Sequence, residues 1–259
     1  MTGLTIVIVS FNAREDLAAC LASLRAAPPA IPHEIVVVDN ASGDGSVEAA
    51  RAVAGVTVIP LERNAGFAAA NNAGIRATQS ELILLLNSDT LVPSGAIDAL
   101  VGRLRADPSL GAAGPRLVDG EGRAELSFGR MMSPLAEWRQ KRRSPAWIDA
   151  ETRREQLVDW VSGACLLVRR ADAEAAGLLD ERFFLYTEDV DFCASIRTRG
   201  RKVLFTPVAT VTHLRGRSRA SRPEPSRKAY RQSHVAFYEK HHPAWAPMLK
   251  LYLRLKGEL

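Results

Sequence analysis

The sequence has 259 residues, of which 47% are hydrophobic and 24% charged, and these are ordinary values for a globular protein with a sizeable core. Its net charge of +5 is local: the segment from Arg215 to Arg231 holds seven cations against Glu224 alone, so the remainder is about −1, which argues against a nucleic-acid partner. No apolar run reaches the roughly 18–20 residues that span a bilayer, and the N-terminus lacks signal-peptide features, so we expect a cytoplasmic protein.

Strands and helices are predicted to alternate through the first half of the chain. Residues 5–9, 35–38, 56–59 and 82–86 read as short buried strands. Between them, Asn12 is expected to cap a helix with Leu17, Cys20, Leu21 and Leu24 on one face, and residues 66–78 read as an Ala-rich helix. Pro93 opens a further helix. This order predicts βαβ units and a mostly parallel sheet with helices on both faces.

Polar clusters follow three of these strands: Ser10-Phe11-Asn12, Asp39-Asn40 and Asn87-Ser88-Asp89. Ligands of such sheets bind beyond the carboxyl ends of the strands. We therefore expect the three clusters to share one rim and to form a binding site.

The second half is less regular. Residues 119–158 read as a long polar excursion, 160–169 as a strand, 188–199 as a helix, and 203–206 and 210–213 as short strands, with a helical tail from Ala229. The cysteines, Cys20, Cys165 and Cys193, are far apart in apolar surroundings, which predicts buried free thiols in a reducing compartment.

Asn87-Ser88-Asp89 allows two interpretations. Its oxygen donors suit a hard cation such as Mg²⁺ or Mn²⁺ that bridges substrate phosphates, but the same residues could form an Asx turn before Pro93. The Asp39–Ser46 loop is equally consistent with a plain turn. Arg63-Asn64-Ala65-Gly66 opens a helix, either as a cap or as a diphosphate site.

The segment Tyr186-Thr187-Glu188-Asp189-Val190-Asp191 concentrates three carboxylates. Thr187 could cap a helix whose first turn is acidic, or one carboxylate could face the cleft as a general base. His213, at the end of a strand, is either a structural histidine or a ligand.

Taken in order, seven segments resemble the inverting glycosyltransferases of family 2, which have the GT-A fold: IVIVSFN, VVVDNASGDGS, ERNAGFAAANNAGI, LLLNSDT, WVSGACLLVRR, FFLYTEDVDF and THLRG. They extend from residue 4 to about 216. Within this family, the sequence most resembles the bacterial rhamnosyltransferases that use dTDP-rhamnose in cell-wall or surface polysaccharide assembly.

The resemblance implies a nucleotide-binding half (1–118) and an acceptor half (119–216). Beyond it, the sequence predicts a basic flexible loop with a helical tail (217–259). The resemblance also implies roles for named residues. The nucleotide-sugar site would comprise Ser10, Phe11, Asn12, Asp39, Arg63, Asn64, Asn72, Asn87, Ser88 and Asp89. Asp89 and His213 would bind the metal, Trp160, Gly163 and Ala164 would line the acceptor side, and Asp189 would be the base, supported by Glu188 and Asp191.

One position departs from the family pattern: where the family commonly has an arginine, this chain has Ser195, and Arg199 on the same helical face is a candidate substitute. Two rival functions remain. A nucleotidyltransferase would want a glycine-rich loop after the first strand, which SFNARED lacks. A non-catalytic nucleotide- or carbohydrate-binding protein would be consistent with Ser195.

The implied partners are a nucleotide-diphosphate sugar and a glycan or polyprenyl-diphosphate-linked acceptor. The basic segment is either a solvated loop or a lid over diphosphate. The basic segment and the tail together, residues 215–259, could contact the membrane surface. Alternatively, the tail could pack against its own domain or against a homodimer partner.

Overall fold

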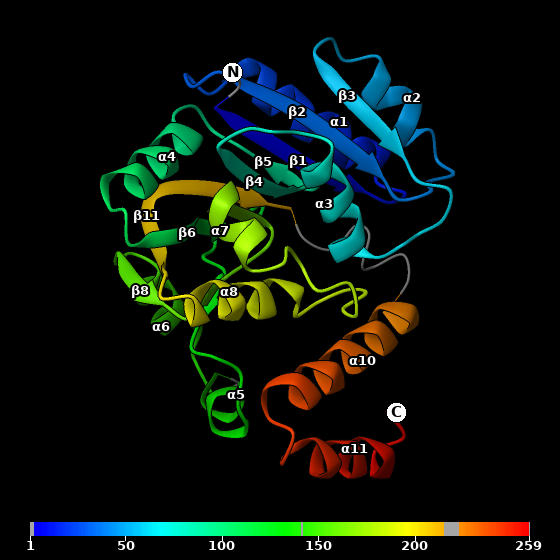
Figure 1. Cartoon of the computed structure of the whole chain (residues 1–259), viewed down its shortest axis with the longest axis vertical. Coiled ribbons are helices and arrows are strands. Elements are labelled where there is room, and N and C mark those ends of the chain that lie inside the picture. Colours follow the sequence, from blue (N-terminus) through cyan, green and yellow to red (C-terminus); the bar gives the residue numbers. More distant parts are fainter. Residues whose placement is uncertain (1–2, 141, 215–222, 259) are drawn as a thin grey trace.

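The computed structural model describes residues 3–140, 142–214 and 223–258. Strands and helices alternate as expected in the first half and continue through the second (Figure 1). The strands are β1 (Leu4–Ser10), β2 (His33–Asp39), β3 (Val56–Pro60), β4 (Leu82–Asn87), β5 (Thr90–Leu91), β6 (Leu110–Val118), β7 (Phe128–Gly129), β8 (Gln156–Val158), β9 (Trp160–Val161), β10 (Cys165–Arg169) and β11 (Lys202–His213). The helices are α1 (Arg14–Ala26), α2 (Ser46–Arg51), α3 (Phe67–Arg76), α4 (Ala96–Ala106), α5 (Pro134–Gln140), α6 (Pro145–Glu151), α7 (Arg170–Ala175), α8 (Glu188–Thr198), α10 (Pro223–His241) and α11 (Ala246–Leu255).

The central sheet runs in the order β3-β2-β1-β4-β10-β6-β11-β5, with β8 paired to β11. β3, β2, β1 and β4 are parallel, as the sequence predicted for this half. β10 lies antiparallel between β4 and β6, and β11 is parallel to β6. The mixed α/β architecture with a mostly parallel central sheet is therefore confirmed.

The central strands β1 and β4 bury both of their faces because helices cover the sheet on both sides. In β4, Leu82, Leu84 and Leu86 belong to one apolar cluster, while Ile83 and Leu85 belong to the other. The first cluster includes the predicted face of α1 and apolar residues of α4; the second includes α3 and α8. This explains why the strands read as continuous apolar runs.

The register brings the three polar strand ends to one edge of the sheet. Ser10 pairs with Asp39 across β1 and β2, and Val9 pairs with Asn87 across β1 and β4. The expectation of a shared polar rim is confirmed.

Other sequence expectations need adjustment. The two strands predicted at 203–206 and 210–213 are one strand, β11, with a register shift between Thr206 and Thr210. The predicted strand at 160–169 is broken by a turn at 162–164 into β9 and β10, and the 119–158 excursion contains β7, α5, α6 and β8. The three cysteines are buried free thiols, as predicted, and burial raises the pKa of each to about 12.

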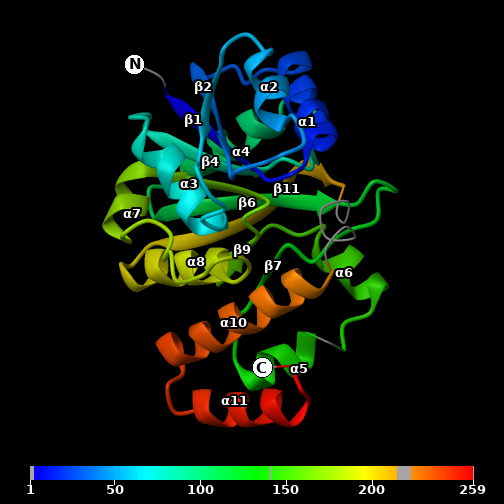
Figure 2. The same ribbon diagram turned by 90° about the vertical axis from the view of Figure 1, so that its right-hand side faces the viewer.

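The tail is helical and packs against the second half. α10 lies between α8 and α11, and α5 lies at the same end of the molecule (Figures 1 and 2). Ser233 of α10 donates to the Leu185 carbonyl, and Tyr238 and His234 both contact the Glu137 carboxylate of α5. Of the basic segment 215–231, residues 215–222, with the predicted boundary at 216, lie outside the described residues. Residues 223–231 belong to α10, which therefore begins before the predicted start of the helical tail at Ala229. Over the described ranges, no helix is both long and apolar enough to cross a bilayer.

Candidate active site

The rim begins with two buried polar groups that have no hydrogen-bond partner among the described residues. Asp39 is 1% exposed; its Oδ2 accepts the backbone N–H of Ser42 at 2.8 Å, whereas its Oδ1 has no partner among the described residues. The Ser10 hydroxyl, directly across the β1–β2 ladder, is also buried and unpartnered within the described chain. Since buried polar atoms are normally hydrogen-bonded, this pair is a candidate ligand contact.

The loops after β1 and β2 hold each other in place. The Asn12 Oδ1 accepts the Gly43 N–H at 2.9 Å, and the Asn12 N–H donates to the Ser42 hydroxyl at 2.9 Å. Asn12 therefore does not cap α1, whose N-cap is Ala13 without a side-chain bond; the prediction of a cap was wrong. Asn12 and Ala41 both have positive φ, at 49° and 64°, which marks these loops as strained. Phe11 lies half-buried beside them.

The helix entry at Gly66 is built by amides rather than by the arginine. Asn64 Oδ1 accepts the Gly66 N–H, and the Asn40 side chain bonds Ala65 N–H and the Gly66 carbonyl. Arg63 is exposed next to this turn.

Asn72 lies elsewhere. It is fully buried, and its side chain bonds both backbone groups of Leu179 and the Glu181 carboxylate. Asn72 thus connects α3 to the segment before α8, and its role in the nucleotide site stays a prediction.

The second part of the rim joins Asp89 to His213. β5 pairs with the end of β11, which sets His213 opposite Thr90. His213 Nε2 lies 3.2 Å from Asp89 Oδ1 and 3.4 Å from the amide nitrogen of Asn87. The amide oxygen of Asn87 is buried with no partner in the described chain, and Ser88 lies half-buried between these groups.

The other ring nitrogen of His213 contacts a carboxylate that the sequence did not single out. Nδ1 lies 3.2 Å from Oε2 of Glu125. Burial lowers the pKa of His213, but hydrogen bonds and charges from Asp89 and Glu125 outweigh it and raise that pKa to about 9. A carboxylate behind an imidazole fixes its tautomer and ring orientation.

The third part of the rim is Asp189, at the start of α8. Its Oδ2 accepts the Gly163 N–H at 2.8 Å, and its Oδ1 accepts the Val190 N–H. The carboxylate is only partly exposed, and burial raises its pKa against the opposing effect of these bonds. A raised pKa suits a group that must take a proton near neutral pH.

Residues 162–164 connect the second and third parts. The Ala164 carbonyl accepts the Asn87 N–H at 3.0 Å, one residue along from the Gly163–Asp189 bond. A Cβ on Gly163 would lie 3.3 Å from the Asp189 Cβ, so the chain passes close beside the carboxylate. Asp89 and Asp189 therefore belong to one rim.

The backbone just before Asp189 is strained. Tyr186 and Thr187 are consecutive residues with φ of 70° and 66°, and such a value is an outlier for β-branched Thr187. Thr187 is the N-cap residue of α8 and the first turn is acidic, as one interpretation had it, but its side chain makes no cap bond within the described residues. Strain of this kind collects at functional loops.

The two neighbouring carboxylates do different things. Glu188 is 5% exposed, one of its oxygens has no described partner, and burial together with Asp189 raises its pKa well above the usual value. Asp191 instead turns toward the tail, where Lys240 Nζ and His241 Nε2 of α10 lie 2.9 Å and 2.6 Å from its oxygens. Its carboxylate thus anchors α10 rather than facing Asp189.

Trp160 is also structural: it is buried and donates from Nε1 to the Arg130 carbonyl. Among the predicted acceptor residues, Gly163 lies beside Asp189 and Ala164 beside Asn87, so these two are at the rim.

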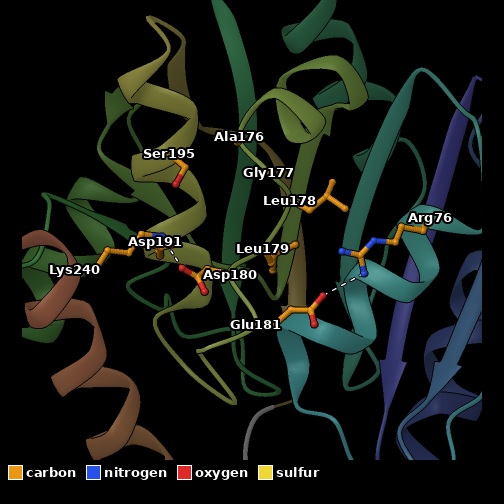
Figure 3. A pocket seen from close by; sticks show the side chains of 10 residues that line it. All are labelled: Arg76, Ala176, Gly177, Leu178, Leu179, Asp180, Glu181, Asp191, Ser195 and Lys240. Carbon is orange, nitrogen blue, oxygen red and sulfur yellow. Dashed lines mark hydrogen bonds and ion pairs between the residues drawn. The ribbon is translucent and has the colours of Figure 1, made fainter.

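Ser195 lines a polar hollow of about 330 Å³ on the side of α8 that carries Asp191 (Figure 3). Lys240 reaches into it and pairs with Asp180 and Asp191, while Arg76 pairs with Glu181 on its other wall. Asp39, Asp89 and Asp189 are not among its lining residues, so this hollow is separate from the rim. Arg199 is exposed at the end of α8, and it is Lys240 and His241 that contact Asp191.

Comparisons with known proteins give this rim a context. Residues 5–175 match the glycosyl transferase family 2 domain. The N-acetylglucosaminyl-diphospho-decaprenol L-rhamnosyltransferase of Mycobacterium tuberculosis is 30% identical over 93% of this chain and 86% of its own length.

Two solved structures share the fold. A mannosyltransferase from Pyrobaculum calidifontis, solved with GDP-Man and Mn²⁺, superposes with a TM-score of 0.66 at 19% identity, over 96% of this chain and 68% of its own. GalNAc-T7, solved with UDP, GalNAc and Mn²⁺, gives a TM-score of 0.64 at 20% identity, over 90% of this chain and 47% of its own. The chain is a glycosyltransferase with the GT-A fold and belongs to glycosyl transferase family 2.

Proposed function

We propose that this chain transfers a sugar from a nucleoside diphosphate to an acceptor hydroxyl in a single displacement that inverts the anomeric configuration. The observation that carries the proposal is the 162–164 connection, which sets Asp189 on the same rim as Asp89 and His213. A carboxylate with a raised pKa at the acceptor side can accept the hydroxyl proton, a role typically contributing about 10²–10⁴-fold in rate.

The residues around Asp89 fit a divalent cation. Among the described residues, no three His, Cys, Asp or Glu side chains converge on one point. The donor set would instead be the Asp89 carboxylate, the Nε2 of His213 and the unpartnered amide oxygen of Asn87, with substrate phosphates completing the shell. Oxygen-rich sets of this kind suit Mg²⁺ or Mn²⁺. When bound, the cation would stabilise the charge that develops on the departing diphosphate.

Asp39 and Ser10 are the residues that we propose to bind the nucleobase of the donor. Asp39 Oδ1 and the Ser10 hydroxyl are buried and free to bond a ligand, while Asp39 Oδ2 is committed to Ser42. A carboxylate oxygen accepts from an imide N–H, which thymine and uracil both carry and which distinguishes them from cytosine. Asn12, Asn40 and Asn64 keep the surrounding loops in shape.

For the donor and acceptor we propose L-rhamnose from dTDP-rhamnose and a polyprenyl-diphosphate-linked glycan in cell-wall or surface polysaccharide synthesis. Support comes from the mycobacterial relative, whose name specifies a rhamnosyl transfer to a diphospho-decaprenol acceptor and which aligns with 93% of this chain. UDP- or GDP-sugars are the alternative donors.

The test is a donor panel. The full chain is incubated with Mn²⁺, dTDP-rhamnose, UDP- or GDP-sugars and a short-chain polyprenyl-diphosphate N-acetylglucosamine, and released nucleoside diphosphate and product are measured. We expect transfer from dTDP-rhamnose, loss with EDTA, and loss of at least about 100-fold in Asp189→Asn with nucleotide binding retained.

Transfer from another donor only would overturn the rhamnose assignment. Nucleotide binding without transfer from any donor would favour the non-catalytic alternative, and pyrophosphate release from a sugar phosphate and a nucleoside triphosphate would favour the nucleotidyltransferase.

A further inference from the structure

Helix α11 has two apolar faces, and the described part of the chain buries only one of them. Ala246 and Leu253 are buried, and Leu249 packs against the second apolar cluster, so this face points inward. The opposite face is exposed along its whole length. It consists of Met248, Leu251, Tyr252 and Leu255, which are 62%, 59%, 51% and 80% exposed. Their spacing of i, i+3, i+4 and i+7 is that of one continuous helical stripe.

Basic residues border this stripe on both sides. At 100° per residue, Arg254 lies along one edge and Lys256 along the other, with Lys250 beyond Arg254. Lys256 stacks over the Tyr252 ring at 4.7 Å, and Lys250 pairs with Glu239 of α10. The sequence has no Asp or Glu from residue 240 to 257. A row of apolar side chains between flanking cations, with no acidic residue in this stretch of sequence, is complementary to an anionic lipid surface.

The helix is held firmly enough to present this face. Arg231 of α10 pairs with Glu258 just beyond α11 at 2.6 Å, and α10 is anchored to α8 through Asp191 and to α5 through Glu137. α5, at the same end of the molecule as α11, exposes Leu135 and Trp138, with Arg142 4.0 Å from the Trp138 ring (Figures 1 and 2).

We infer that the outer face of α11, the Met248–Leu255 stripe with its flanking cations, docks the protein on an anionic membrane surface. The inference rests on the proposed lipid-linked acceptor, whose carrier lies in a bilayer, whereas the described chain has no helix able to span one. The apolar side chains would enter the interface and Arg254 and Lys256 would meet lipid phosphates. Each basic residue near such a surface contributes about fivefold in binding.

A second copy of the chain fits this face less well. In a twofold dimer through the stripe, the cationic borders of one α11 would face those of its partner. Glu258, the nearest acid after the helix, is committed to Arg231.

The experiment is flotation of the full chain with vesicles of phosphatidylcholine alone or mixed with phosphatidylglycerol. We compare the wild type, the stripe variant L251S/L255S, the charge variant R254E/K256E, and the control L157S/V208S. The control removes two exposed apolar side chains, 53% and 49% exposed, on β8 and β11, far from α11 in the sequence. All the substituted side chains are surface residues, and unchanged thermal unfolding verifies that each variant folds.

We expect the wild type and the control to float with anionic vesicles only. The stripe variant should bind at least about tenfold more weakly, and the charge variant about 25-fold more weakly or worse, since two cations are reversed. Either a wild type that does not float or a stripe variant that floats as well as the wild type overturns the inference. So does a concentration-dependent dimer, found by sedimentation without lipid, that the stripe variant abolishes.

The two proposals fail differently. Flotation measures docking without turnover, so its outcome stands whatever donor the panel identifies. Transfer to a short-chain, water-soluble acceptor should be unchanged in the stripe variant, and equal loss of transfer to soluble and vesicle-bound acceptors would contradict a docking role.

Discussion

Replacing Gly66 by alanine should lower the rate of transfer by displacing Asp189, although Gly66 does not itself belong to the catalytic group. Gly66 has φ 88° and ψ 169°, a region of backbone conformation that is essentially restricted to glycine. A Cβ here would lie 2.5 Å from the Phe184 carbonyl oxygen and 2.8 Å from the Phe184 Cδ2. The same carbonyl accepts the Phe67 N–H at 2.8 Å, so it cannot move without breaking that bond.

The size of the effect follows from these distances. Ordinary contact begins at 3.4 Å, so the Phe184 carbonyl must retreat by the difference from 2.5 Å, which is 0.9 Å. Phe184 leads through the strained Tyr186-Thr187 pair to Asp189, and a misplacement of about 1 Å can cost about 100-fold in rate. The backbone strain costs about 1–3 kcal/mol. In a chain of this size each kcal/mol lowers Tm by about 2–4 °C.

The assay is sugar transfer at saturating donor, together with thermal unfolding. Gly43→Ala is the control, because it lies in the rim loop after Asp39 but its Cβ would meet nothing within 4 Å. We expect kcat to fall by about 100-fold in Gly66→Ala and to stay near the wild-type value in the control. A Gly66→Ala enzyme with wild-type kcat and Tm would refute the coupling between this helix entry and the base.

Three further outcomes are expected. Asp39→Asn should weaken nucleotide binding, measured by calorimetry, by about 10–100-fold. Both oxygens of the carboxylate can accept hydrogen bonds, one from the Ser42 N–H and the other from the ligand, whereas only one terminal atom of an amide is an acceptor. Unchanged affinity would remove Asp39 from the site. Glu188→Gln should stabilise the protein, and the gain in Tm should increase from pH 4.5 to pH 8. The pKa of Glu188 is raised in the folded state, so the wild-type protein loses stability as the pH rises above the pKa of this carboxyl in the unfolded chain, whereas glutamine does not titrate. Equal Tm gains at both pH values would contradict a Glu188 that is buried in its protonated form. Asp191→Asn should speed amide hydrogen exchange in α10 while exchange in α1 stays unchanged, because the contacts of Asp191 with Lys240 and His241 are weakened. Protection of α10 equal to the wild type would show that other contacts hold the helix.

The first half of the fold was readable because its signals are local. β1, β2 and β4 are apolar runs buried on both faces, and α1 and α4 show regular apolar spacing, so the parallel sheet and its polar rim could be predicted. Asp39 and Asp89 then stood out as carboxylates at strand ends.

Contacts between distant segments could not be read in this way. Glu125 is one of many acids in a polar stretch without periodicity, and its contact with His213 spans 88 positions. Lys240 and His241 looked like parts of a basic tail, since nothing local links them to Asp191. Asn72 was assigned to the nucleotide site by the family resemblance, and its hydrogen bonds to Leu179, 107 positions away, could not be predicted from the sequence.

Of three further features found in the structure, two had partial signals in the sequence. An acid placed before the last strand could have suggested a partner for His213. The i, i+3, i+4, i+7 spacing of α11 was visible in the sequence, but which of its two apolar faces is buried depends on how α10 turns the helix. The strained φ values at Tyr186 and Thr187 had no signal, because neither residue type favours that conformation.

The insertion of β10 between β4 and β6 has a mechanical consequence. The strand hydrogen-bonds to both neighbours, so a single sheet runs without interruption from β3, in the half carrying Asp39, to β11, which ends at His213. A rigid-body separation of the two halves would break the backbone hydrogen bonds of β10 to its neighbouring strands, which are buried beneath helices on both sides of the sheet. Substrates must therefore enter and products leave by rearrangement of the connecting segments at the sheet edge, and turnover in this enzyme is expected to be paced by segment motion instead of domain hinging.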